Sequence, residues 1–213
     1  MPQFNRRELD ERSRQYGFNR DTFEKVLRLK IILEYFNSQD YLKEHLLLKG
    51  GTAINLTIFN LPRLSVDIDL DFVPNLPREE TMSAREAVSD IIRRYMSEQG
   101  YSLSEASRFS HSLDAFHYNY TNAAGNRDMI KIEINYSLRT HVFQAEERCL
   151  LTDAFGEPIS VNTVAVADIR IFWTKTARQT RGSLRSIFTL ERVIRLKQRK
   201  PLRNLKKTSV RRN

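Results

Sequence analysis

The chain has 213 residues, of which 40% are hydrophobic, 10% aromatic and 29% charged. This composition is typical of a globular protein with a buried core, and it excludes a fibrous or wholly disordered chain. No stretch approaches the roughly 18 apolar residues that span a bilayer, and residues 1–14 carry too many charges for a signal peptide. We therefore expect a cytoplasmic protein with no membrane partner.

The net charge of +9 is concentrated at the C-terminal end. From Lys175 onward there are 14 Lys and Arg residues and one acid, Glu191, whereas residues 1–174 hold 21 basic and 25 acidic residues. We predict a folded domain over residues 1–181 and a basic tail over 182–213 that is either disordered or aberrant. A block of this kind is either a solvated or disordered tail or a nucleic-acid-binding element, and the sequence leaves both open.

Hydrophobic periodicity predicts alternating helices and strands along the chain. Asp21 and Glu24 form a plausible capping box for a helix that ends near Phe36. The further predicted elements are a strand over 46–48, a helix over 52–60, a strand over 65–73, a helix over 84–95, strands over 112–120 and 128–137, and a helix that begins near Ala167. This pattern predicts one α/β domain rather than two separate folds.

An acidic strand lies at the centre of this pattern. Apolar and acidic residues alternate over 65–73, so Asp67, Asp69 and Asp71 project from the same side. Their mutual repulsion is costly unless a cation lies among them. Oxygen ligands with no nearby histidine favour Mg²⁺ or Mn²⁺ over zinc. The alternative is an exposed edge strand whose acids face water.

Two of the seven glycines, Gly50 and Gly51, lie where the strand over 46–48 meets the next helix. Glycine there allows a close approach of the backbone to a ligand, and the helix N-terminus offers free N–H groups to a phosphate. Glycines at such a position can also serve turn geometry alone. A phosphate-binding turn followed by a metal-binding strand suggests nucleotidyl transfer, because a nucleoside triphosphate needs both.

The same residues carry a family resemblance: Lys49-Gly50-Gly51-Thr52-Ala53, then Arg63, Ser65 and Asp67-Ile68-Asp69-Leu70-Asp71-Phe72. The sequence resembles the AbiEii/AbiGii family of toxin nucleotidyltransferases, which includes MenT-like toxins of the DNA polymerase β-like minimal nucleotidyltransferase superfamily. The resemblance implies an α/β (α+β) nucleotidyltransferase fold over residues 1–181, with a mixed β-sheet flanked by helices. It implies transfer of a nucleoside monophosphate from a nucleoside triphosphate to an RNA acceptor, such as a tRNA 3′ end, by two-metal catalysis with Mg²⁺ or Mn²⁺. It also implies a cognate antitoxin, as in type IV-like toxin–antitoxin and abortive-infection systems.

The resemblance also implies roles for individual residues. Asp67 and Asp69 would be the paired metal ligands, and Asp71 would not bind the metal. The nucleotide-binding positions would be Gly50, Gly51, Thr52 and Ser65. A hydroxyl that only caps the entry to the strand is the alternative role for Ser65.

The strand over 128–137 and one distant lysine complete the predicted site. Isoleucines form one face of this strand, while Lys131 and Glu133 lie on the other. The resemblance to the superfamily implies a third carboxylate that is catalytic and binds metal, and Glu133 is the candidate. Lys131 would contact a phosphate. A salt bridge between the two is the alternative. Lys175 aligns loosely with a catalytic family lysine, or it is simply the first residue of the basic block.

The C-terminal part departs from the family pattern. Where the family typically has Arg-Asp-hydrophobic-Tyr-Asp, residues 185–189 read Arg-Ser-Ile-Phe-Thr and lack both acids. Three alternatives to an active toxin follow: an inactive relative that binds nucleotide or RNA, a frameshifted gene product, and an Asp-x-Asp glycosyltransferase, which would not need the Gly-Gly-Thr turn. The histidines are scattered and receive no role: His45, His111, His117 and His141.

Overall fold

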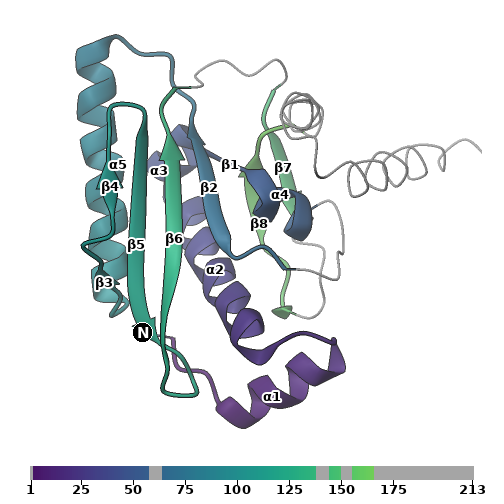
Figure 1. Cartoon of the computed structure of the whole chain (residues 1–213). Helices are drawn as coiled ribbons and strands as arrows, with labels where there is room; N and C mark the ends of the chain where they lie inside the picture. The colour runs from purple at the N-terminus through teal and green to yellow at the C-terminus, as the bar shows by residue number, and fades with distance from the viewer. Residues whose placement is uncertain (1, 58–63, 138–143, 150–154, 166–213) are drawn as a thin grey trace, which may run out of the picture. The chain divides into compact units, whose positions relative to one another are not determined.

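The computed structural model describes residues 2–57, 64–137, 144–149 and 155–165 (Figure 1). The chain divides into two units, Met1–Ile169 and Arg170–Asn213. The whole second unit lies outside the described residues. The predicted helix near Ala167 and the predicted tail over 182–213 also lie outside them, so the proposed boundary after residue 181 stays a prediction.

Within the described ranges the predicted helices and strands occur in the predicted order, together with further helices and strands that the periodicity did not predict. The helices are α1 (Arg6–Gln15), α2 (Arg20–Ser38), α3 (Asp40–His45), α4 (Gly50–Thr57) and α5 (Arg78–Glu98). The strands are β1 (Leu46–Lys49), β2 (Asp67–Phe72), β3 (Ser102–Leu103), β4 (Arg108–Phe109), β5 (Leu113–Thr121), β6 (Arg127–Asn135), β7 (Glu146–Cys149) and β8 (Ser160–Thr163). The predicted strands that became β1, β2, β5 and β6 are confirmed.

The start of α2 differs from the prediction. Asn19 is the N-cap, and its side-chain oxygen accepts from the backbone N–H groups of Asp21 and Thr22. The predicted capping box is wrong because Glu24 is fully buried and bound elsewhere. The Arg28 Nε donates to Glu24 Oε1 at 2.9 Å, and the Ala123 N–H donates to Oε2 at 2.9 Å. Glu24 therefore fastens α2 to the β5–β6 hairpin instead of capping it.

The strands form one mixed sheet in the order β3-β5-β6-β2-β1-β8-β7, with β4 paired to β5 beside β3. The acidic strand β2 lies inside this sheet, parallel to β6 and antiparallel to β1. The predicted mixed β-sheet flanked by helices is confirmed. The alternative of an exposed edge strand is wrong, because β2 has a paired neighbour on each side.

One face of the sheet carries the core. The side chains of Ile68 and Leu70 on β2 are buried there, and α2 runs behind the strands in Figure 1. Helix α5 packs on the same face, because the Arg85 Nε donates to the Asp114 carboxylate at 3.0 Å and Arg93 lies over the Phe116 ring. Burial of this face leaves the opposite side chains of β2 and β6 for a polar site.

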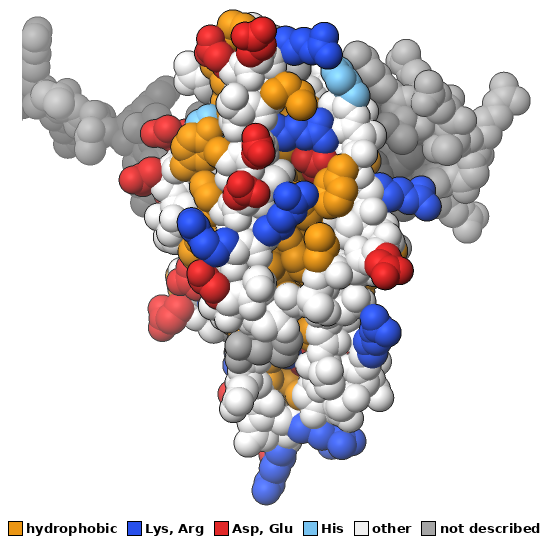
Figure 2. Space-filling model, turned by 90° about the vertical axis from the view of Figure 1, so that its left-hand side faces the viewer, with side chains coloured by type: hydrophobic (Ala, Val, Ile, Leu, Met, Phe, Trp, Pro, Cys, Tyr) orange, Lys and Arg blue, Asp and Glu red, His pale blue; other side chains and the backbone are white. Residues whose placement is uncertain are grey.

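Figure 2 shows the side of the molecule that lies on the left of Figure 1. Lys and Arg side chains lie there among Asp, Glu and hydrophobic side chains, with no block of a single charge. This mixture agrees with the near balance of charge before residue 175. None of the helices in the described ranges has the length and apolarity to cross a lipid bilayer.

Candidate active site

The side chains of β2 and β6 that point away from the core form a polar face. Register aligns the two parallel strands residue by residue, so paired side chains project from the same side of the sheet. The pairs on this face are Asp67 with Lys131, Asp69 with Glu133 and Asp71 with Asn135. We call these six residues the polar face; β1 adds Lys49, which is paired with Asp69.

The Gly50–Gly51 turn lies directly against the polar face. Gly50 has a φ of 70°, a left-handed conformation that favours glycine. A Cβ atom at Gly50 would collide with the Asp69 carboxylate, and one at Gly51 would lie 3.1 Å from the Ser65 hydroxyl. The turn at the start of α4 and the acidic strand therefore form one continuous site.

Hydrogen bonds hold this turn in place. The Thr52 hydroxyl bonds to the backbone carbonyl of Asp67 and lies 2.9 Å from the Ser65 hydroxyl. The Asn55 side-chain oxygen accepts from the Ser65 N–H at 2.8 Å. Thr52 is fully buried, so its hydroxyl secures α4 to β2. The hydroxyl is thus already bound within the protein.

The carboxylates of the polar face carry more negative charge than Lys49 and Lys131 balance. Burial raises the pKa of Asp69, and the charges of Glu133 and Asp67 raise it further, against the opposing effect of Lys131 and Lys49. Lys131 Nζ lies 2.9 Å from Glu133 Oε1, and this hydrogen bond is the main cause that raises the Lys131 pKa. The alternative of a Lys131–Glu133 salt bridge is thus realised in the structure, beside an Asp69 that repels its neighbours.

Asp71 has a different environment from the other two aspartates. It is 1% exposed, forms an ion pair with Lys49 and accepts from the Asn135 side chain at 2.8 Å. These contacts occupy the Asp71 carboxylate; that Asp71 does not bind the metal stays a prediction. Sequence reasoning missed this cluster, because it joins residues that are far apart in the sequence: the β2–β6 register pairs Asn135 with Asp71, and Lys49, which the register pairs with Asp69, reaches Asp71 diagonally.

The structure brings most of the predicted site residues together at the start of α4, on the neighbouring strands β2 and β6, and just before β2. They are Gly50, Gly51, Thr52, Ser65, Asp67, Asp69, Lys131 and Glu133. Lys175 lies outside the described residues. Within the described ranges, no group of three or more His, Cys, Asp or Glu side chains is arranged to hold a metal ion. The donor chemistry still fits a hard cation, since Asp67, Asp69 and Glu133 present carboxylate oxygens from the same side of two paired strands.

A family comparison agrees with this arrangement. The sequence model described as "Nucleotidyl transferase AbiEii toxin, Type IV TA system" matches residues 31–182. The chain belongs to the AbiEii family. The matched range includes the Gly50–Gly51 turn, β2 and β6, so the site described here lies inside the family domain. The resemblance stated from the motifs is confirmed.

Two solved structures resemble this AbiEii chain. JHP933 from Helicobacter pylori matches with a TM-score of 0.42 and 16% identity, over 68% of this chain and 52% of that one. MenT4, the nucleotidyltransferase toxin Rv2826c from Mycobacterium tuberculosis H37Rv, matches with a TM-score of 0.47 and 16% identity, over 76% of this chain and 56% of that one. The chain thus spans about half the length of both proteins. No curated protein matches it.

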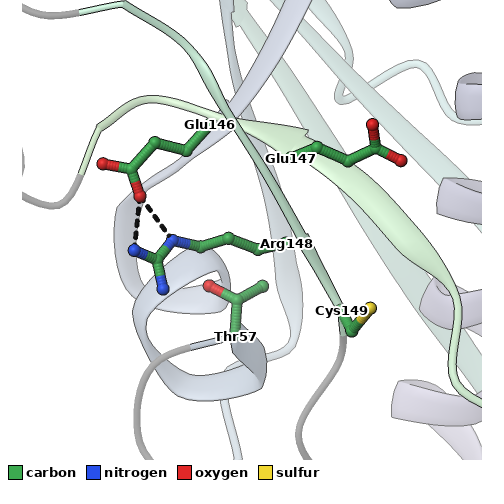
Figure 3. A pocket seen from close by; sticks show the side chains of 5 residues that line it. All are labelled: Thr57, Glu146, Glu147, Arg148 and Cys149. Atoms are coloured by element: carbon green, nitrogen blue, oxygen red, sulfur yellow. Dashed lines mark hydrogen bonds and ion pairs between the residues drawn. The ribbon is translucent and has the colours of Figure 1, made fainter.

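A separate hollow of about 560 Å³ lies beside the strand β7 (Figure 3). Its lining residues are Thr57, Glu146, Glu147, Arg148 and Cys149. The Arg148 Nε donates to Glu146 Oε2 at 2.8 Å, so these two charges pair with each other. The Cys149 thiol is exposed and lies 3.7 Å from the Ser160 hydroxyl. The lining therefore offers no paired carboxylates of the kind found on the polar face.

Proposed function

We propose that this AbiEii chain transfers a nucleoside monophosphate from a nucleoside triphosphate to an RNA acceptor, the 3′ end of a tRNA, with Mg²⁺ or Mn²⁺. The acceptor hydroxyl loses its proton to the solvent, its oxygen bonds to the α-phosphorus, and the bond from that phosphorus to the leaving pyrophosphate breaks. The chain would act as the toxin of a type IV-like toxin–antitoxin or abortive-infection system, with a cognate antitoxin protein as its partner. We place it in the cytoplasm.

The backbone of the glycine turn would hold the triphosphate. The N–H groups of Gly51 and Thr52 lie in the first turn of α4, where the helix leaves them without backbone acceptors. The Ser65 hydroxyl, next to this turn, would bind a phosphate oxygen. Because Thr52 and Asn55 fix the turn to β2, the phosphates would be positioned beside the carboxylates without a loop rearrangement.

The carboxylates of Asp67, Asp69 and Glu133 would hold the divalent cations. When bound, such cations lower the pKa of the acceptor hydroxyl and neutralise the triphosphate and its leaving group. Lys131, beside Glu133, would contact a phosphate oxygen, and Lys175 would add a further contact to the nucleotide. The protein's own contribution is positioning and charge balance.

One observation carries the proposal: the Gly50 backbone lies so close to Asp69 that no Cβ atom fits between them. If the turn and the acidic strand served two separate sites, nothing would require them to lie in contact. Chemistry on a triphosphate needs both groups within the reach of one ligand. The Gly50–Asp69 contact supplies that proximity.

Incorporation of labelled nucleotide tests the proposal. The full chain is incubated with each labelled nucleoside triphosphate, Mg²⁺ and total tRNA, beside the variants Asp67→Asn and Asp90→Asn. Asp90 is an exposed aspartate on α5, which packs on the opposite face of the sheet, so it is the matched control. We expect labelled tRNA and released pyrophosphate with the natural chain and with Asp90→Asn, and none with Asp67→Asn.

Two other results would contradict the proposal. Triphosphate binding without incorporation of any of the nucleotides into tRNA would identify an inactive relative that has kept its phosphate-binding turn. Transfer of a sugar from a nucleotide-sugar donor would identify a glycosyltransferase that uses the same acidic strand.

A further inference from the structure

Two basic side chains extend the polar face beyond β6. The sheet continues from β6 to β5 and then to β4. Register pairs His117 with Lys131, and it pairs Ala115 with both Glu133 and Arg108. Because directly paired side chains project from the same side of a sheet, Arg108 and His117 lie on the same face as Asp67, Asp69 and Glu133.

These two side chains are available for a ligand. Arg108 is exposed and forms no ion pair with any described residue. His117 is partly buried, and its Nδ1 is enclosed without a hydrogen-bond partner among the described residues. An enclosed polar atom without a partner is costly, and Nδ1 is too enclosed for a phosphate, so a contact between His117 and a ligand would use the other ring nitrogen, Nε2. Lys131, between His117 and Asp67, is already bound to Glu133.

The order of the strands indicates the side from which the acceptor approaches the triphosphate. The Gly50–Gly51 turn lies on the β1 side of β2, whereas β6, β5 and β4 lie on the other side. In phosphoryl transfer the attacking and leaving oxygens lie roughly in line across the reacting phosphorus. If pyrophosphate leaves toward the turn, the acceptor must approach from the side of β6 and β5.

We propose that Arg108 and His117 bind the phosphodiester backbone of the RNA acceptor next to its reacting hydroxyl. This inference rests on the proposed function, because the direction of approach depends on a triphosphate at the glycine turn. An arginine guanidinium matches the geometry of a phosphate and binds it through two N–H groups. The imidazole of His117 offers one further N–H donor closer to Lys131 and the carboxylates. With RNA as the acceptor of the proposed function, these two side chains would hold it through its phosphates, without base readout.

The affinity for RNA, measured without triphosphate or metal, tests this role. The full chain and the variants Arg108→Gln, His117→Gln and Arg94→Gln are titrated with a fluorescent single-stranded RNA that carries a free 3′ hydroxyl. Arg94 is an exposed arginine on α5, on the opposite face of the sheet, and it is the matched control. Thermal unfolding of each variant verifies that the fold is kept.

We expect Arg108→Gln to raise the Kd for RNA several-fold and to reduce the slope of log K against log salt by about 1, since one phosphate contact is lost. We expect His117→Gln to raise the Kd as well, and Arg94→Gln to leave it unchanged. The KM for RNA should rise in both site variants while the affinity for triphosphate stays constant.

Several results would overturn the proposal. Unchanged RNA affinity in Arg108→Gln, an equal loss of triphosphate affinity, an equal effect of Arg94→Gln, or no measurable RNA affinity of the natural chain would each do so. The two proposals fail separately. RNA binding that depends on Arg108 without any incorporation would defeat only the transfer activity, whereas incorporation that is insensitive to both variants would defeat only the acceptor site.

Discussion

Gly50 and Asp69 are in such close contact that the glycine has no room for a side chain. The backbone at Gly50 also has a positive φ of 70°. Two separate effects therefore oppose any substitution at this position: backbone strain and a collision with a carboxylate of the site. The structure offers a way to separate them.

We predict that Gly50→Ala abolishes nucleotide transfer, while Gly17→Ala does not. Gly17 has a similar φ of 73°, but a Cβ there would meet no atom within 4 Å. Gly17→Ala should therefore show the backbone strain alone, a loss of about 1 kcal/mol of unfolding free energy. Gly50→Ala should lose more stability, because Asp69 must also move. Urea unfolding and labelled-nucleotide incorporation measure the two effects, and equal loss of stability in both variants would contradict the collision.

A second prediction concerns the charge of Asp69. Burial and the neighbouring carboxylates raise its pKa in the folded protein, so its ionised form destabilises the fold. This destabilisation is present above the folded pKa and is lost as the pH falls through it. We expect Asp69→Asn to raise the Tm at neutral pH by about 1–4 °C, the range for relief of like-charge repulsion, and to remove this part of the pH dependence. A lower Tm at neutral pH would show that the aspartate is stabilised by its surroundings.

A third prediction concerns the effect of Mg²⁺ on the Tm. If Asp67 and Asp69 bind a divalent cation, Mg²⁺ should raise the Tm of the natural chain, because a ligand that binds only the folded state stabilises it. The increase should disappear in Asp69→Asn and persist in Asp90→Asn. Differential scanning fluorimetry over a Mg²⁺ series measures it without any reaction. An equal increase in both variants would assign the effect to general ionic screening.

The Thr52 hydroxyl provides a test of the turn. Thr52→Val keeps the shape of this fully buried side chain and removes its bonds to Ser65 and to the Asp67 carbonyl. We expect a loss of about 1–3 kcal/mol of unfolding free energy together with weaker triphosphate binding. Thr52→Ser, which keeps the hydroxyl, should retain most of the triphosphate affinity. Calorimetric titration with triphosphate separates the two variants; equal affinities would mean that the hydroxyl does not position the turn.

The two roles considered for Glu133 predict different kinetics. As a metal ligand, Glu133→Gln should reduce kcat by roughly 100-fold or more, with a smaller effect of Lys131→Met. If Glu133 is only half of a salt bridge, both variants should behave alike and change kcat little. The pair is partly exposed, and such pairs contribute at most about 1 kcal/mol to stability. Steady-state kinetics of the two variants decides between these roles.

Local sequence patterns predicted much of the fold, and they failed where contacts between distant residues decide. The alternation over 65–73 gave the correct face for Asp67 and Asp69, because side-chain direction in a strand depends only on period. The predicted cap of α2 was wrong because Asn19, not Asp21, is the N-cap. Glu24 instead binds Arg28 on the same helix and the backbone of Ala123, nearly 100 residues away.

Strand pairing could not be read from period alone. The sequence placed Asp71 on the same side as Asp69, but it could not show that Asp71 binds Asn135, its partner in the β2–β6 register, and Lys49, which reaches it diagonally from β1. His117 received no role for the same reason. Its place beside Lys131 depends on the pairing of β5 with β6, which no pattern within either strand specifies.

The parallel pairing of β2 with β6 makes the site a late product of folding. Asp69 and Glu133 are 64 residues apart in the sequence, and α5 and the strand β5 lie between them. Closing so long a loop is entropically costly and slows folding compared with a hairpin such as β5–β6. A ribosome-bound chain that stops before β6 has the glycine turn and two aspartates but lacks the opposing carboxylate. Any activity that depends on Glu133 therefore begins only after this central pair has formed.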